Sequence, residues 1–208
     1  MAVKSNLVNM ALVLTGTCLV CSALLGGAYA ITKNPIDAAA LEKTNRAIGA
    51  VLPAFEKAEE ATLDLDGKPV HYYKALSGGE TVGYAIESSS VGFGGNLSLM
   101  VGITPDGVVY NTSVLSHSET PGLGAKCTTD RKFMDQWQGF DPSVKILSVK
   151  KDGGDVDAIT ASTITSRAYT QAVATALAVF STLNGKPADA VSGASVKPQN
   201  QEGGQDHE

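Results

Sequence analysis

Residues 97–115 read LSLMVGITPDGVVYNTSVL, and this stretch decides the expected fold. Its two halves are rich in Val, Ile, Leu and Tyr, which favour strands. Pro105-Asp106-Gly107 stands between them as a typical turn sequence. Two strand-like runs joined by a short turn predict neighbouring antiparallel strands over residues 97–103 and 108–115.

The sheet is expected to continue on both sides of this pair. Upstream, residues 70–75 and 81–87 are also rich in strand-forming side chains. Downstream, residues 144–150 predict a further strand, and Asp152-Gly153-Gly154-Asp155 predicts a turn. Short strands that follow one another along the chain predict a mostly antiparallel meander.

Two helices are expected beside this sheet. Residues 128–138 predict a short helix that ends near Gly139, and the Ala-rich residues 164–183 predict a long one. The sequence Asn184-Gly185-Lys186-Pro187 is a typical helix stop. The fold class is therefore α+β. The buried face of the long helix is expected to hold Ile164, Ala168, Ala172, Leu177 and Phe180.

The N-terminal part of the chain has a different composition. Leu7 to Ile31 contains no charged residue, and Lys4 and Lys33 flank it. About 20 apolar residues suffice for a helix to cross the hydrocarbon core of a membrane, so we expect a single transmembrane anchor. The alternative is a cleaved signal peptide, because Ala28-Tyr29-Ala30 fits a cleavage pattern. Signal peptides usually have a shorter apolar run, which favours the anchor.

Composition predicts the character of the remaining parts of the chain. Asn34-Pro35 is expected to break the first helix or to mark its exit from the membrane, and a second helical stretch follows it. The residues beyond Pro187 are polar and mostly acidic in charge, which predicts disorder. The expected segments are an anchor over 1–33, a helical connector over 34–60, a folded domain over 61–186 and a disordered acidic tail over 187–208.

Charge and composition exclude several classes of function. The net charge is −5, from 16 basic and 21 acidic side chains, so a nucleic-acid partner is not expected. No two of the three histidines are spaced as zinc ligands, and no metal site is expected. Cys18 and Cys21 form a CxxC within the apolar run, which we interpret as two small membrane-helix residues rather than a redox pair.

Two segments contain residues that could bind a ligand or be modified by one. The first, residues 117–124, reads HSETPGLG and follows a predicted strand; its glycines allow the backbone to approach a ligand, although they are equally typical of a tight connection. The second, residues 157–166, reads DAITASTITS and places five hydroxyl residues at the start of the long helix. Hydroxyls there are typical of helix caps, but a helix N-terminus also binds phosphate, and a Thr hydroxyl can be esterified to one.

These two segments give the chain a specific resemblance. It resembles the G subunit of the Rnf ion-translocating electron-transport complex and, more distantly, the C subunit of the sodium-translocating NADH:quinone reductase. The family has one N-terminal membrane helix, an ETPGLG loop and the motif D-x-x-[ST]-G-A-T-x-[ST]. ETPGLG is complete at residues 119–124. The second motif departs from the family at Ala161, where Gly is usual, and at Ser162, where Ala is usual.

The resemblance implies a cofactor and its site. In this family FMN is attached through a phosphoester to the Thr that matches Thr163, by a separate flavin transferase acting on FAD. The cofactor-binding residues implied beside Thr163 are Asp157, Thr160, Ser162, Thr165, Glu119, Thr120, Leu123, Gly122 and Gly124. Residues 92–95, Gly-Phe-Gly-Gly, resemble a glycine-aromatic-glycine segment of the family.

The resemblance also implies a function and a location. The chain would relay electrons through FMN as one subunit of a ferredoxin:NAD oxidoreductase that translocates ions, with no catalytic residue of its own. Its partners would be the other Rnf subunits, the flavin transferase and membrane lipid. The flanking charges leave the orientation open; the family places the domain on the periplasmic side of the inner membrane. The alternative is a membrane-anchored scaffold domain whose hydroxyl cluster only caps a helix.

Overall fold

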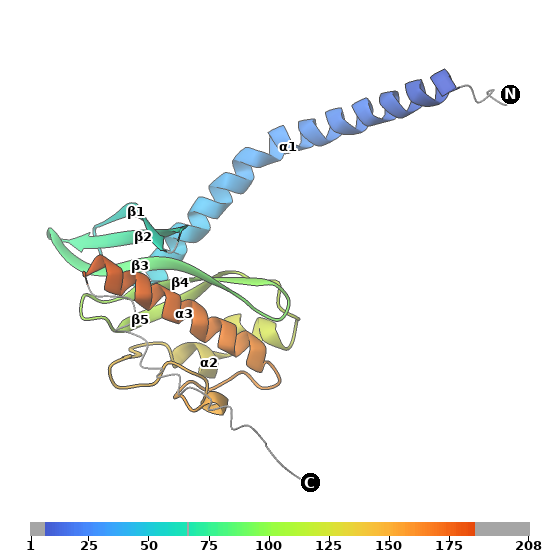
Figure 1. Ribbon diagram of the computed structural model, residues 1–208. Coiled ribbons are helices and arrows are strands. Elements are labelled where there is room, and N and C mark those ends of the chain that lie inside the picture. Colours follow the sequence, from blue (N-terminus) through green and yellow to red (C-terminus); the bar gives the residue numbers. More distant parts are fainter. Residues whose placement is uncertain (1–6, 66, 186–208) are drawn as a thin grey trace, which may run out of the picture. The chain divides into compact units, whose positions relative to one another are not determined.

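The computed structural model describes residues 7–65 and 67–185. The chain divides into two compact units, residues 1–45 and residues 46–208. Figure 1 labels the three α-helices and the five strands. In chain order the elements are α1 (Leu7–Val51), β1 (Lys57–Leu65), β2 (Lys68–Ser77), β3 (Glu80–Val91), β4 (Asn96–Ile103), β5 (Val109–Ser116), η1 (Gly124–Thr128), α2 (Arg131–Asp135), η2 (Lys150–Asp152) and α3 (Thr163–Leu183).

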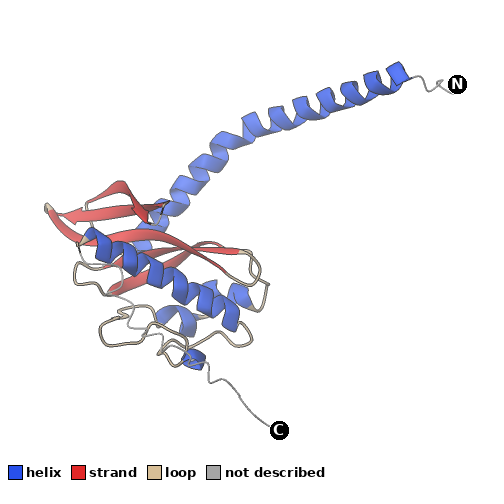
Figure 2. Ribbon diagram, viewed as in Figure 1, coloured by secondary structure: helices blue, strands red, loops and turns tan. Residues whose placement is uncertain are grey.

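The five strands form one antiparallel sheet in the order β1-β2-β3-β4-β5. Four of the five predicted strands correspond to β2, β3, β4 and β5. Figure 2 shows the strands as a single layer with α3 across it. The mostly antiparallel α+β fold is therefore confirmed.

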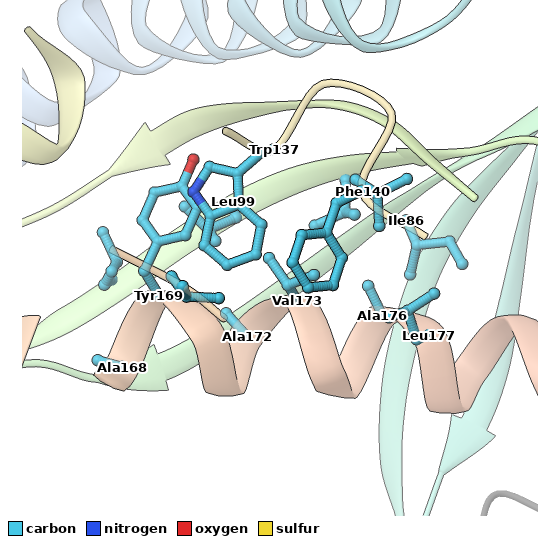
Figure 3. Close-up of a cluster of buried hydrophobic side chains, with 14 of the residues drawn as sticks. Ile86, Leu99, Trp137, Phe140, Ala168, Tyr169, Ala172, Val173, Ala176 and Leu177 are labelled. Carbon is cyan, nitrogen blue, oxygen red and sulfur yellow. The ribbon is translucent and has the colours of Figure 1, made fainter. Parts of the chain in front are cut away.

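One face of the sheet packs against α3. Alternate residues of β4, including Leu99 and Val101, are fully buried there with Ile86 of β3. The helix contributes small and branched side chains to the same core, and Figure 3 shows Val173 and Leu177 among them. Trp137, Phe133, Phe140 and Tyr169 form a cluster of ring contacts at one side of this core. Burial of this large apolar surface fixes α3 against the sheet.

The opposite face of the sheet is covered by the end of α1. Ala47, Ile48 and Val51, which belong to the second unit, pack with Met100 of β4. Gly102 lies directly against the Val51 backbone, and a Cβ at this position would collide with the Val51 carbonyl oxygen. Glycine therefore permits the close approach of helix and sheet.

The part of α1 that belongs to the first unit contains the candidate membrane span. A window near the N-terminus has mean hydropathy 2.0 with none of it buried, which is long and apolar enough to cross a membrane, although a signal sequence has the same character. Of the two alternatives expected for Asn34-Pro35, the helix break is wrong, because Pro35 lies inside the continuous α1. The exit from the membrane stays a prediction. Proline removes one backbone hydrogen bond and strains a helix, but it does not have to end one.

Three other expectations need correction. The connector predicted as helical up to residue 60 contains the start of β1, because pairing with β2 overrides the helix-forming Lys, Glu and Ala of this stretch. Residues 144–150 form no strand; Val149 makes only an isolated bridge to Val156. The helix predicted over 128–138 is shortened to α2, because η1 ends at Thr128 and α2 covers only Arg131–Asp135. Asp130 caps α2 by accepting from the backbone N–H of Lys132 and of Phe133.

The long helix follows its prediction closely, with one exception. Ala168, Ala172, Leu177 and Phe180 are buried, but Ile164 is 50% exposed and lines a cavity at the start of the helix. The helix ends at Leu183, and Gly185 has φ 69°. The predicted disordered tail, residues 187–208, lies outside the described residues, and the expected segment boundaries stay predictions. The division between the two compact units falls within the predicted connector.

Candidate functional site

A cavity of about 360 Å³ opens at the N-terminal end of α3. Three segments that are distant in sequence form its walls: the turn between β3 and β4, the ETPGLG loop and the first turn of α3. Its lining residues are Phe93, Glu119, Thr120, Leu123, Gly124, Ala161, Ser162, Thr163, Ile164 and Thr165. The structure thus brings the two segments singled out in the sequence to one place.

Glu119 holds these three segments together. Its side chain is buried, and its Oε2 accepts a hydrogen bond from Thr165 Oγ1 at 2.7 Å. Its Oε1 accepts from the backbone N–H of Gly94 at 3.2 Å. Gly124 packs against the same carboxylate, and a Cβ there would collide with Glu119 and with Thr165. Glycine at this position lets loop and helix meet.

The loop itself is closed by its own backbone. The carbonyl of Thr120 accepts from the N–H of Leu123 at 3.2 Å and of Ala125 at 3.1 Å. Gly122, at the tip, has φ 77° with open space around it, so it serves the turn and does not line the cavity. His117 precedes the loop, and its Nδ1 accepts from the backbone N–H of Glu119 at 3.2 Å.

The first turn of α3 presents unpaired backbone donors. Ser162 occupies the N-cap position, yet its side chain makes no capping hydrogen bond. Within the part of the chain that the structure describes, the N–H groups of Thr163, Ile164 and Thr165 have no acceptor. These donors and the positive end of the helix dipole suit an anion.

Ala161 adopts an unusual backbone conformation at this point. Its φ is 61°, and it is the one non-glycine residue with positive φ in the described chain. The left-handed region costs an alanine about 1–2 kcal/mol. The strain lies at the position where the resembled family has glycine.

The five hydroxyl residues of the cluster have different surroundings. Thr165 donates to Glu119, and Ser166 donates to the Ser162 carbonyl while accepting from the Ile159 N–H; both side chains are buried. Ser162 is buried as well, and Thr160 is exposed but does not line the cavity. Thr163 is half-buried and lines the cavity. It is therefore the one hydroxyl of the five that is both at the cavity and partly accessible.

A charged turn lies next to Thr163. Lys151 Nζ donates to Thr163 Oγ1 at 3.2 Å. On one side of Lys151, Lys150 pairs with Asp157 at 2.9 Å. On the other side, Asp152 accepts two hydrogen bonds from Arg167, both at 2.7 Å. These partners hold the pKa values of Asp157 and Asp152 below their usual range.

Asp157 therefore lies away from the cavity, where it stabilises the charged turn. It does not line the cavity, and its carboxylate is engaged by Lys150. Its backbone is fixed too, since Gln136 bonds both its N–H and its carbonyl. Of the ten predicted site residues, Asp157, Thr160 and Gly122 are outside the cavity lining and the other seven are in it.

The arrangement suits a ligand that combines a phosphate with an apolar ring. The free N–H groups and Lys151 offer donors and positive charge at one side. Phe93, Leu123 and Ile164 line the cavity and are 69%, 44% and 50% exposed, so they offer apolar surface to a ring system. The cavity volume lies within the range typical of sites for small molecules and cofactors. FMN has both parts, and the residues present fit it.

Comparison with known proteins agrees with this class of site. Residues 92–178 match the family described as FMN-binding domain. This range contains the Phe93 turn, the ETPGLG loop, the charged turn and the first part of α3. The fold and the site therefore define an FMN-binding domain.

Comparison with individual relatives shows the family within this class. The G subunit of the ion-translocating oxidoreductase complex of Methanosarcina acetivorans is 38% identical over 172 residues, with 80% of this chain and 90% of the relative covered. The G subunit of the proton-translocating ferredoxin:NAD(+) oxidoreductase complex of Clostridium ljungdahlii is 33% identical over 175 residues, covering 83% and 90%. The chain belongs to the family of G subunits of Rnf-type ion-translocating oxidoreductase complexes, as its two motifs predicted.

A solved structure shows a more distant likeness. The C subunit of the Na⁺-translocating NADH-quinone reductase from Parabacteroides distasonis aligns with a TM-score of 0.45 at 18% identity. The alignment covers 65% of this chain and 79% of that chain.

Three residues at the site are not predicted by the sequence as ligand contacts. The sequence marks Phe93 only as part of a glycine-rich segment, and its helical pattern predicts Ile164 on the buried face of the helix. Nothing in the sequence distinguishes Lys151 from the other lysines. No signal in the sequence links Lys151 to Thr163, because their contact depends on how the turn at η2 folds against α3.

Proposed function

We propose that this protein is an electron-transfer subunit of a membrane-bound, ion-translocating ferredoxin:NAD oxidoreductase of the Rnf type. In this proposal it carries FMN as a phosphoester on Thr163. The observation that supports the assignment is the position of that hydroxyl: it is half-buried at the cavity, on the first residue of α3, among unpaired backbone donors.

Each part of the cavity has a role in this proposal. Bound FMN supplies a ring that accepts and releases one or two electrons. The N–H groups at the start of α3 stabilise the charge of the phosphate. Phe93, Leu123 and Ile164 provide apolar surface for the ring. Glu119 keeps the loop and the helix together by its bonds to Thr165 and Gly94.

The attachment needs an external catalyst. Thr163 Oγ forms a bond to the FMN-side phosphorus of FAD while the pyrophosphate P–O bond breaks, and AMP leaves with the electron pair of that bond. The hydroxyl proton goes to a base of the flavin transferase, because a Thr hydroxyl is a weak nucleophile alone. Asp157, the acid nearest to Thr163 in the sequence motif, is engaged by Lys150 and does not line the cavity, which supports a separate transferase.

The apolar part of α1 and the names of the relatives support a membrane context. We propose that the apolar part of α1 is retained as a single-pass anchor in the inner membrane, with the FMN-binding domain on the periplasmic side. The names of the relatives describe subunits of a complex, so the proposed partners are the other Rnf subunits, with lipid around the anchor.

The alternative is a scaffold domain whose hydroxyls only cap α3. The contacts of these hydroxyls favour the proposal. The N-cap residue Ser162 makes no side-chain cap, and Thr165 bonds to Glu119 rather than to the helix backbone. Thr163 and Thr165 thus make contacts at the cavity, and capping alone does not account for these two hydroxyls.

One experiment separates these two functions. The full chain is produced with and without a flavin transferase, purified in detergent and denatured, and the protein is then separated from free flavin. The proposal expects flavin absorbance to stay with the denatured chain, and its mass to rise by one FMN ester, only when the transferase is present. A protein that remains colourless and unmodified with an active transferase would support the scaffold.

A further inference from the structure

We propose that Lys151 is the positioning residue for the acceptor: it holds the Thr163 hydroxyl before attachment and then pairs with the phosphoester charge. This inference rests on the proposed function. It deepens that function by assigning a residue outside the family motif, in a turn 12 residues before Thr163.

The contact between the two side chains is direct. Lys151 Nζ donates to Thr163 Oγ1 at 3.2 Å. A cationic donor on the hydroxyl oxygen fixes the direction of its lone pairs. It also stabilises the negative charge that grows on this oxygen when the proton leaves for the transferase. Once the ester is formed, the same ammonium group lies beside the phosphate oxygens without moving to a new place.

The turn that carries Lys151 is fixed at both of its neighbours. Lys150 pairs with Asp157, which precedes Thr163 in the acceptor segment. Asp152 accepts both bonds of the Arg167 guanidinium, and Arg167 lies one helical turn after Thr163. Three consecutive side chains of η2 thus contact the acceptor itself and one residue on each side of it in the sequence. This arrangement holds the Lys151 backbone in place relative to Thr163.

The ion pairs around the acceptor also distinguish Lys151 from the neighbouring cations. Among the described residues, Lys150 and Arg167 have acidic partners at 2.9 and 2.7 Å, whereas Lys151 forms no ion pair. An FMN phosphate esterified to Thr163 is a phosphodiester with a single negative charge. Lys151 is the cation already in contact with the oxygen that joins this ester. It can therefore neutralise the phosphodiester without breaking an existing ion pair.

The test uses the full chain in detergent, a purified flavin transferase and FAD. The variants are Lys151→Met, which keeps the length of the side chain and removes its charge, and Lys151→Arg, which keeps the charge. Lys132→Met, an exposed lysine of α2 outside the cavity lining, is the matched control. The measurements are the initial rate of flavin attachment by intact mass, the melting temperature, and the ³¹P chemical shift of the loaded protein.

The variants are expected to differ in the rate of flavin attachment but not in melting temperature, which separates a positioning role from a folding defect. Lys151→Met should slow attachment by about tenfold or more, because a charge-assisted hydrogen bond is lost at the reacting oxygen. Lys151→Arg should recover most of the rate, and Lys132→Met should keep it. The melting temperatures should be unchanged. The ³¹P shift should move in loaded Lys151→Met and not in loaded Lys132→Met.

Three results would overturn the inference, and they separate the role of Lys151 from the proposed function. If wild type loads and Lys151→Met loads equally fast with the same ³¹P shift, Lys151 has no such role and the proposed function stands. The same conclusion applies if Lys151→Met loads slowly only in proportion to a fallen melting temperature. If wild type takes up no flavin from an active transferase, the proposed function fails, and the role of Lys151 fails with it.

Discussion

Thr165 Oγ1 donates a hydrogen bond of 2.7 Å to the buried carboxylate of Glu119. This bond joins the ETPGLG loop to the first turn of α3, and the second oxygen of the same carboxylate reaches the turn before β4 through Gly94. Three walls of one cavity therefore meet at one side chain. Changes to this junction should alter the cavity and the stability of the domain together.

The first prediction concerns the donor of that bond. Thr165→Val keeps the shape of the side chain and leaves the buried carboxylate with one partner fewer. We expect the free energy of unfolding to fall by about 1–3 kcal/mol. Denaturant unfolding followed by the fluorescence of Trp137, the single and fully buried tryptophan, measures this directly. Thr182→Val, an exposed threonine of the same helix, is the control and should change little.

The second prediction separates the two glycines of the loop. Gly124→Ala places a methyl group on Glu119 and Thr165, so the loop must shift and flavin loading should fall strongly. Gly122→Ala meets no neighbour but must keep φ near 77°, so it should cost about 1 kcal/mol of stability with loading intact. Intact mass and unfolding curves of both variants test this. Equal loading of both would show that Gly124 is not needed for the shape of the cavity.

The sequence predicts the sheet and the long helix well because their signals are local. Strand-forming residues on both sides of Pro105-Asp106-Gly107 predict β4 and β5, and the Ala-rich run predicts α3. The start of β1 is missed because its Lys, Glu and Ala favour a helix, and only pairing with β2 makes it a strand. At Pro35 the local signal is strong, because proline usually ends a helix, but α1 continues through it.

For the candidate site too, the sequence predicts the local motifs but not the contacts that depend on tertiary structure. The ETPGLG loop and the hydroxyl cluster are visible as motifs, and the structure places both at one cavity. The sequence does not rank the five hydroxyls by accessibility, because their exposure depends on the packing of α3. Nor does it show that Lys151 meets Thr163, since this contact is made by tertiary structure alone.

The third prediction concerns strain at Ala161. Ala161→Gly removes the methyl group that disfavours φ 61°, and the gain exceeds the added entropy of the unfolded chain. We expect the domain to be more stable by up to about 1 kcal/mol. Ala178→Gly, within the regular part of α3, should instead destabilise it by about 1 kcal/mol. A loss of stability in Ala161→Gly would contradict the strained conformation.

The fourth prediction concerns Cys127, which is fully buried. Burial, together with the nearby charge of Glu119, raises the pKa of its thiol from 9.0 to about 11. The folded protein favours the neutral thiol, so this group contributes stability below pH 9, and the contribution is lost as the pH rises toward 11. Peptide-resolved iodoacetamide labelling at pH 8 should find Cys127 unmodified until the domain is unfolded. Rapid labelling of Cys127 in the folded domain would contradict its burial.

The central claim is that Thr163 carries FMN, and peptide mass spectrometry of the full chain co-produced with its flavin transferase tests it most directly. The account predicts the FMN ester on Thr163, its absence from Thr163→Val with the domain still folded, and partial retention in Thr163→Ser. The half-buried Thr163 at the cavity, beside the engaged Thr165 and the buried Ser162, is the physical reason. FMN found on Ser162 or Thr165, or persisting in Thr163→Val, would contradict the account.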